Sequence, residues 1–188
     1  LAVYADDFIA GFQYKEDAER YYALLKERLK KFNLELEESK SRMIEFGKYA
    51  KINSKRKYGR KAETFNFLGF TLYCGKSRHS GEFCVKLKTN SKKFTQKLKQ
   101  TKEWLYQNND LPVKDLITRL NKKLVGHYRY YGVSHNINKL SAFLHYVQRY
   151  LFKVLNRRSH KKSYTWDGYI DMLKVYPLAK PKIYVKLF

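Results

Sequence analysis

Two adjacent carboxylates, Asp6 and Asp7, lie between two short apolar runs, residues 1–5 and 8–12. Apolar runs joined by two polar residues predict a β-hairpin with buried strands. Carboxylates this close repel each other unless a cation lies between them, and carboxylate oxygens are what Mg²⁺ uses in sites that it shares with substrate phosphates. The pair is therefore a candidate metal site. Aspartates are also common in turns, because their side chains bond the nearby backbone, so a plain turn is the alternative.

The chain is strongly basic: its 188 residues include 40 Lys+Arg against 17 Asp+Glu, a net charge of +23. Such an excess predicts salt-sensitive binding to a polyanion, of which nucleic acid is the commonest. Residues 1–88 hold 19 basic and 12 acidic side chains, whereas residues 89–188 hold 21 and 5, so the second part is the expected binder. No membrane partner is expected, because long uncharged apolar stretches and an amphipathic leader are missing from the sequence.

The composition is typical of a folded protein, and the few cysteines lead us to expect a reducing compartment. Its residues are 44% hydrophobic and 16% aromatic, which is typical of a globular chain with one or two domains. Two cysteines, Cys74 and Cys84, are too few for a disulfide framework, and the sequence has no secretory leader. We therefore expect free thiols and a cytoplasmic protein associated with nucleic acid.

Periodicity predicts strands and a helix in the first part of the chain. Apolar positions recur with a helical period over residues 16–33, with acidic residues at the start and lysines near the end. Further short strands are expected at residues 43–47, 65–73 and 83–87, the last two as a pair. Residues 48–63 are interpreted as a basic loop.

From Ser91 the apolar pattern becomes helical and remains so. Helices are expected at about residues 91–106, 112–132 and 137–155, with a short helix after Trp166 and an extended tail. The predicted fold class is therefore α+β: a layer of antiparallel strands with a helix, followed by an all-α bundle. The predicted domains are residues 1–88 and residues 89–188.

Three motifs resemble, in order and approximate spacing, the later palm motifs of reverse transcriptases. They are Tyr4-Ala5-Asp6-Asp7, the Leu34-x-Leu36 pair followed by Lys40, and Phe67-Leu68-Gly69-Phe70. The helical part, with the GHYRYYGV stretch at residues 126–133, looks like the thumb or maturase region of bacterial group II intron-encoded proteins. The chain thus resembles the C-terminal part of a group II intron reverse transcriptase and maturase over nearly its whole length.

The resemblance implies catalytic roles for three residues. Asp6 and Asp7 match the paired aspartates that hold two Mg²⁺ ions, which lie roughly 3.5–4 Å apart in such sites. Lys40 matches a lysine that assists the departing pyrophosphate, with an ordinary surface lysine as the alternative. A primer-grip-like stretch, in which glycine permits close approach of a primer strand, is formed by Phe67, Leu68, Gly69 and Phe70. Core packing by its three apolar residues is the alternative.

Basic side chains in both parts are expected to contact RNA phosphates. They are Lys55, Arg56, Lys57, Arg60, Lys122, Lys123, Arg129, Arg157, Arg158, Lys161 and Lys162. Cations at a helix end also suit the helix dipole, which is the alternative for the last four. At least two of Tyr128, Tyr130 and Tyr131 are expected in the core, because a helix buries one face.

The resemblance implies RNA-templated DNA synthesis by the intact protein, with an RNA template, a DNA primer and dNTPs, together with binding of intron RNA and assistance to its splicing. In this family a further palm carboxylate and the fingers lie upstream of the acidic turn. We therefore expect this chain by itself to bind RNA with little or no catalysis. The alternative is a non-enzymatic RNA-binding maturase module that acts only in splicing. A weaker alternative is a basic helical domain that binds DNA.

Overall fold

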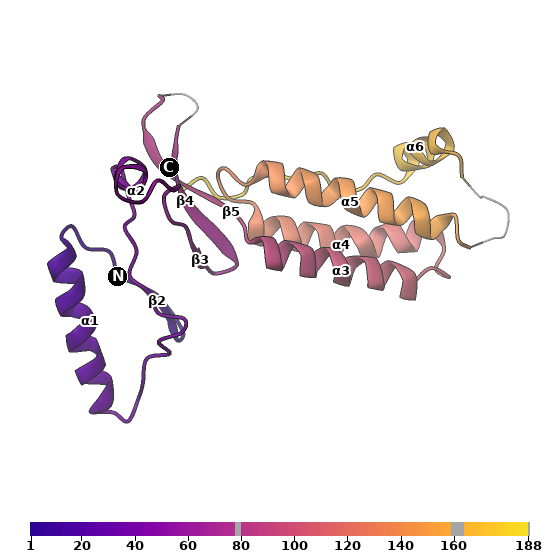
Figure 1. The fold of residues 1–188 in the computed structure, drawn as a ribbon. Helices are drawn as coiled ribbons and strands as arrows, with labels where there is room; N and C mark the ends of the chain where they lie inside the picture. Colours follow the sequence, from indigo (N-terminus) through magenta and orange to yellow (C-terminus); the bar gives the residue numbers. More distant parts are fainter. Residues whose placement is uncertain (78–79, 159–163, 188) are drawn as a thin grey trace. The chain divides into compact units, whose positions relative to one another are not determined.

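The computed structural model describes residues 1–77, 80–158 and 164–187, and the chain divides into two compact units, Leu1–Glu63 and Thr64–Phe188 (Figure 1). The predicted α+β class is confirmed, because small antiparallel sheets precede a set of long helices. The change from strands to helices falls at residues 89–91. The strands just before it nevertheless belong to the same compact unit as the helices.

The first unit begins with the predicted hairpin. Strands β1 (Ala2–Tyr4) and β2 (Asp7–Ile9) pair antiparallel, with Ala2 opposite Ile9 and Tyr4 opposite Asp7. Every residue of β1 is exposed, so the expectation of buried strands is wrong. A two-stranded ladder of three residues buries little surface by itself.

Two helices follow in the same unit, α1 (Lys15–Lys30) and α2 (Ala50–Tyr58). The predicted helix is confirmed as α1, which has acidic residues in its first turn and basic ones in its last, as the helix dipole favours. The expected strand at residues 43–47 is absent, because those described residues form no ladder. The expected basic loop at residues 48–63 instead contains α2, which ends at Gly59 with a φ of +63°.

The second unit opens with an antiparallel sheet in the order β3-β4-β5. Its strands are β3 (Phe65–Phe67), β4 (Phe70–Lys76) and β5 (Phe83–Thr89). The predicted pairing of the last two is confirmed, with Leu72 opposite Leu87. The single strand expected at residues 65–73 is wrong, because a two-residue turn at Leu68 and Gly69 folds it into a hairpin.

Three long helices and a short one complete this unit, close to the predicted bounds. They are α3 (Ser91–Gln107), α4 (Val113–Tyr131), α5 (Ile137–Leu155) and α6 (Trp166–Val175). Asn90 caps α3 by accepting hydrogen bonds from the backbone N–H groups of Lys92 and Lys93, and Thr165 caps α6 in the same way through Gly168. Figure 1 shows α3, α4 and α5 lying alongside one another.

Leucine, phenylalanine and valine side chains of the three long helices form the core of this unit. On α4, Leu116, Leu120, Leu124 and Tyr128 recur every fourth residue and are at most 1% exposed. The tail after α6 returns to the end of α4, where the backbone N–H groups of Tyr184 and Val185 both donate to the Gly132 carbonyl. Among the described residues, no helix has the length and apolar character needed to span a membrane.

Candidate functional site

The hairpin of the first unit carries the two candidate metal ligands at its turn. Ala5 and Asp6 form the turn, and Asp7 opens β2 opposite Tyr4. Both aspartates are exposed to solvent. Ala5 has a φ of +51°, which is unfavourable for a residue with a Cβ; backbone strain of this kind occurs at functional sites.

The donor set of this turn fits an open metal site. Within the part of the chain that the structure describes, no cluster of three or more Asp, Glu, His or Cys side chains forms, so the turn contributes two carboxylates. Mg²⁺ commonly takes one or two protein carboxylates and completes its shell with water and substrate phosphate oxygens. Asp6 and Asp7 therefore fit an ion shared with a phosphate and do not fit a closed protein cage.

Lys40 lies in the connection between α1 and α2, and its side chain is exposed. Its backbone N–H donates to the Glu37 carbonyl oxygen at 3.0 Å. The hydroxyl and backbone N–H of Ser39 lower the pKa of the Glu37 carboxyl, and the charge of Lys40 adds to this effect. The role of Lys40 at a departing pyrophosphate remains a prediction.

The cations predicted to bind RNA in the first unit are all exposed and gather at the end of α2: Lys55, Arg56, Lys57 and Arg60. Lys57 Nζ lies 3.7 Å from a carboxylate oxygen of Glu45, and the Arg60 guanidinium lies 5.0 Å from the ring centroid of Tyr58. Positive charge at a helix C-terminus suits the helix dipole. The end of α2 thus presents a cationic surface, and its contact with RNA remains a prediction.

The primer-grip-like stretch forms the turn between β3 and β4 in the second unit. Leu68 and Gly69 both have positive φ angles, +48° and +76°. The Tyr130 hydroxyl donates to the Leu68 carbonyl at 3.0 Å, and the Asn90 backbone N–H donates to the Gly69 carbonyl at 2.9 Å. A Cβ on Gly69 would lie 3.0 Å from the Tyr131 hydroxyl oxygen, so this close approach and the φ angle both favour glycine.

Aromatic packing holds the same turn against the end of α4. The ring of Phe70, which is 9% exposed, stacks on Tyr130 at 6.1 Å and meets the edge of Tyr131 at 5.3 Å. Tyr128 is fully buried, Tyr131 packs against the core, and Tyr130 is 56% exposed. Phe67 and Leu68 are half-buried. Packing therefore accounts for Phe70, and a primer contact by this stretch remains a prediction.

A buried asparagine, which sequence reasoning missed, fastens the sheet to the helices. The Asn136 side-chain oxygen accepts from the Thr89 backbone N–H, and its amide nitrogen donates to the Thr89 hydroxyl and the Tyr131 carbonyl, each at 2.8 Å. Asn136 is fully buried. All these partners lie more than four residues away in the chain, so no local sequence pattern signals the cluster.

The predicted RNA-binding cations of the second unit (Thr64–Phe188), called the helical unit from here on, fall into three groups. The first is exposed: Lys122, Lys123, Arg129 and Arg157. The second is Arg158, which is half-buried, and burial lowers the pKa of its guanidinium. The third, Lys161 and Lys162, lies outside the described residues. Two exposed cations lie over aromatic rings, Lys123 at 4.9 Å from the Trp104 centroid and Arg157 at 5.3 Å from that of Tyr106. Mixed aromatic and cationic surfaces suit single-stranded nucleic acid.

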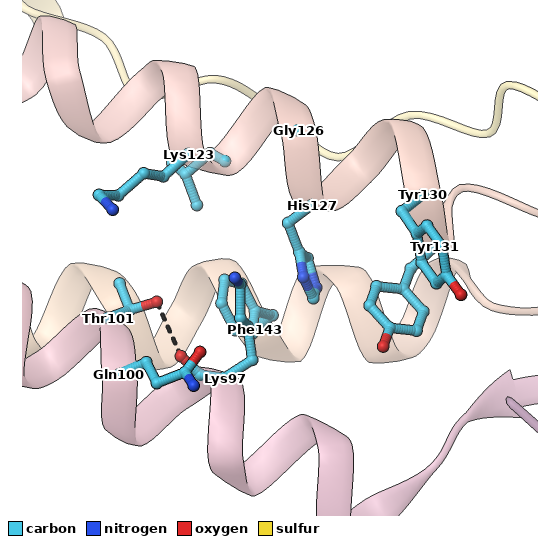
Figure 2. Close-up of a pocket in the computed structure, with 10 residues that line it drawn as sticks. Lys97, Gln100, Thr101, Lys123, Gly126, His127, Tyr130, Tyr131 and Phe143 are labelled. Carbon is cyan, nitrogen blue, oxygen red and sulfur yellow. Dashed lines mark hydrogen bonds between the residues drawn. The ribbon is translucent and has the colours of Figure 1, made fainter. Parts of the chain in front are cut away.

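A hollow with a volume of about 340 Å³ lies beside α3 and α4 (Figure 2). Its lining includes the imidazole of His127, which is 5% exposed and stacks on Phe143 with centroids 4.0 Å apart. Burial, and secondarily the charge of Lys97, lowers the pKa of His127 to about 4, so the ring is neutral near pH 7. Neither ring nitrogen has a hydrogen-bond partner among the described residues.

Two family models match separate parts of the chain. Residues 1–72 match the family described as reverse transcriptase (RNA-dependent DNA polymerase), and residues 91–169 match the group II intron, maturase-specific domain. The first match contains the acidic hairpin, and the second contains α3, α4 and α5. Neither the curated proteins nor the solved structures contain a match.

Proposed function

Because the chain belongs to the group II intron reverse transcriptases and maturases, we propose that its helical unit binds structured intron RNA and that its acidic hairpin contributes metal ligands for DNA synthesis. The observation that carries the proposal is the distribution of charge. Residues 64–188 hold 25 basic and 6 acidic side chains, whereas residues 1–63 hold 15 and 11. The helical unit therefore has the electrostatic character of a polyanion binder.

Binding by the helical unit rests on phosphate contacts that position the RNA. Lys122, Lys123, Arg129 and Arg157 are exposed on α4 and just beyond α5. Lysine and arginine side chains that neutralise phosphates release bound counterions, so affinity for RNA falls steeply with salt. Splicing assistance follows from this binding, because a ligand that binds only the folded intron stabilises that fold.

Asp6 and Asp7 would hold Mg²⁺, which activates the primer hydroxyl and neutralises charge on the leaving pyrophosphate. The hairpin presents both carboxylates to solvent, where a phosphate can reach them. Lys40, also exposed in this unit, would add positive charge at the leaving group. The Leu68–Gly69 turn would bring backbone close to the primer strand.

We further propose that this chain by itself binds RNA but polymerises little. The described residues supply two carboxylates at the hairpin without a third Asp, Glu, His or Cys. Ligands and positioning groups each contribute several kcal/mol to such a reaction, roughly 3 kcal/mol for one donor to a developing charge. In a longer protein that includes this chain, we expect D6N and D7N together to abolish primer extension while splicing assistance continues.

The metal site is testable in the chain as it stands. Mn²⁺, which replaces Mg²⁺ and broadens nearby NMR signals, should broaden the amide signals of residues 4–9 at low stoichiometry. The D6N/D7N chain should lose this broadening and keep its affinity for RNA. Broadening that is unaffected by the substitution would overturn the metal assignment, and loss of RNA affinity would overturn the division of roles between the units.

A further inference from the structure

The glycine at position 126 lies inside α4, where the chain itself does not require it. A Cβ placed there would meet no atom within 4 Å. Glycine in a helix interior is less stable than alanine, so the sequence accepts a less stable helix without a gain in packing. Gly132, just after α4, differs: a Cβ there would lie 2.3 Å from the Tyr128 carbonyl oxygen, so packing explains that glycine.

Gly126 is exposed and borders a hollow of about 340 Å³ (Figure 2). Gly126 and His127 line it from α4, and Lys97 and Gln100 line it from α3. This volume lies in the range of pockets that hold small ligands. The chain thus leaves room next to a bare stretch of helix backbone, where another molecule can approach closely.

The wall of this hollow contains a polar group that the described residues leave without a hydrogen-bond partner. His127 is only 5% exposed, and neither of its ring nitrogens has a hydrogen-bond partner among the described residues. A neutral imidazole has one N–H donor and one acceptor nitrogen. Buried polar groups are almost always paired, so an unpaired imidazole facing a hollow indicates a ligand that pairs with it.

The charges and amides around the hollow identify the ligand's chemistry. Lys97 and Lys123 are exposed and lie at its edge, suited to a phosphate. A second hollow of about 230 Å³ shares Lys97 and Gln100 and continues along α3 past Lys93. The Gln100 amide and the His127 imidazole, both in the lining, are groups that can pair with base edges, and Tyr131 adds an aromatic ring.

We propose that this hollow binds one unpaired RNA nucleotide, with its base against Gly126 and the His127 ring and its phosphate at Lys97 and Lys123. Unstacked bases in loops and bulges are the part of RNA that proteins read most specifically, because their edges are free. This proposal rests on the proposed RNA-binding function and specifies the form of RNA that is bound.

Substitution of Gly126 separates the proposed site from the stability of the fold. G126A should raise the melting temperature of the chain, because alanine favours the helix and meets no clash. The same variant should bind an RNA hairpin with an unpaired loop at least tenfold more weakly at fixed salt. Its affinity for a fully paired RNA duplex of the same length should be unchanged, because phosphate contacts elsewhere remain.

Thr118 provides the matched control. It lies exposed on α4, outside the hollow, so T118A should also favour the helix and should leave both RNA affinities unchanged. H127F keeps a ring for the stack on Phe143 and removes the unpaired nitrogens, and it should lose several-fold affinity for the loop RNA alone.

Equal binding of loop RNA by G126A and the unsubstituted chain would overturn the nucleotide site, and so would an equal loss for loop and duplex. In either case the proposed function stands, since the unsubstituted chain binds RNA. If the unsubstituted chain binds neither RNA, the proposed function fails and the nucleotide site fails with it.

Discussion

The Tyr130 hydroxyl donates a hydrogen bond to the Leu68 carbonyl oxygen at 3.0 Å, although 62 residues separate the two in the chain. This bond joins the end of α4 to the turn between β3 and β4. Leu68 has a φ of +48°, an unfavourable backbone conformation for leucine, and the bond helps to hold it there. The geometry of the turn therefore depends on a contact with α4 as well as on its own residues.

Removing the hydroxyl tests this dependence. Y130F keeps the ring that stacks on Phe70 and loses only the hydrogen bond. Because Tyr130 is 56% exposed, we expect a modest loss of unfolding free energy, about 0.5–1 kcal/mol. Urea denaturation measures it. Y146F, at another exposed tyrosine of the helical unit, serves as the control and should change stability by less.

The buried Asn136 should contribute more to stability. N136A removes three hydrogen bonds and leaves the Thr89 backbone N–H without its partner inside the protein. We expect a loss of about 2–4 kcal/mol in the free energy of unfolding. The exposed Asn138 on α5 is the matched control, and N138A should change stability by less than about 0.5 kcal/mol. Equal effects of the two substitutions would contradict the role of Asn136.

Because burial lowers the pKa of His127, the stability of the chain should depend on pH. Its pKa falls from 6.5 to about 4 on folding, so the unfolded chain takes up a proton at a higher pH than the folded chain. The stabilising contribution is complete above pH 6.5 and is lost as the pH falls toward 4. The loss amounts to about 3 kcal/mol.

The variant H127F isolates this contribution, because the other titrating groups remain the same in both proteins. The difference in unfolding free energy between the variant and the unsubstituted chain should grow between pH 6.5 and pH 4, in favour of the variant. A difference that stays constant over this interval would show that the imidazole titrates alike in the folded and unfolded chains.

Hydrogen exchange should differ strongly between the elements. Helix α1 has no buried residue, whereas α4 and α5 each bury six. Amides with little burial around them exchange through small local openings, and core helices exchange only in large ones. We expect amides of α1 and of the β1–β2 hairpin to exchange fastest, and those of α4 and α5 slowest. Similar protection in α1 and α5 would contradict this ranking.

Periodicity predicted the long helices well, because each has an apolar stripe that the core requires. On α4, Leu116, Leu120, Leu124 and Tyr128 give that stripe directly. Helix α2 was missed because it lacks such a stripe: its buried residues are Ala50 and Ser54, and its last turn is basic. A search for apolar periodicity does not detect a helix without such a stripe.

The candidate sites divide in the same way. Adjacent aspartates are visible in the sequence, so the hairpin could be predicted there, although its turn falls at Ala5 and Asp6, one residue earlier than predicted. The break at Leu68 and Gly69 was only partly visible in the sequence, because Gly69 is a turn signal but leucine at positive φ has none. Contacts of Asn136 and the burial of His127 depend on tertiary packing between elements far apart in the chain. The residue types Asn and His alone do not reveal that these two side chains are buried.

RNA affinity measured at several salt concentrations is the decisive test of RNA binding by this chain. We expect the chain to bind a structured RNA with unpaired loops more tightly than arbitrary duplex DNA of the same length. The logarithm of the RNA affinity should fall linearly with the logarithm of the salt concentration, as counterion release requires. Equal affinity for the two nucleic acids, or an RNA affinity that does not respond to salt, would contradict an RNA-binding helical unit.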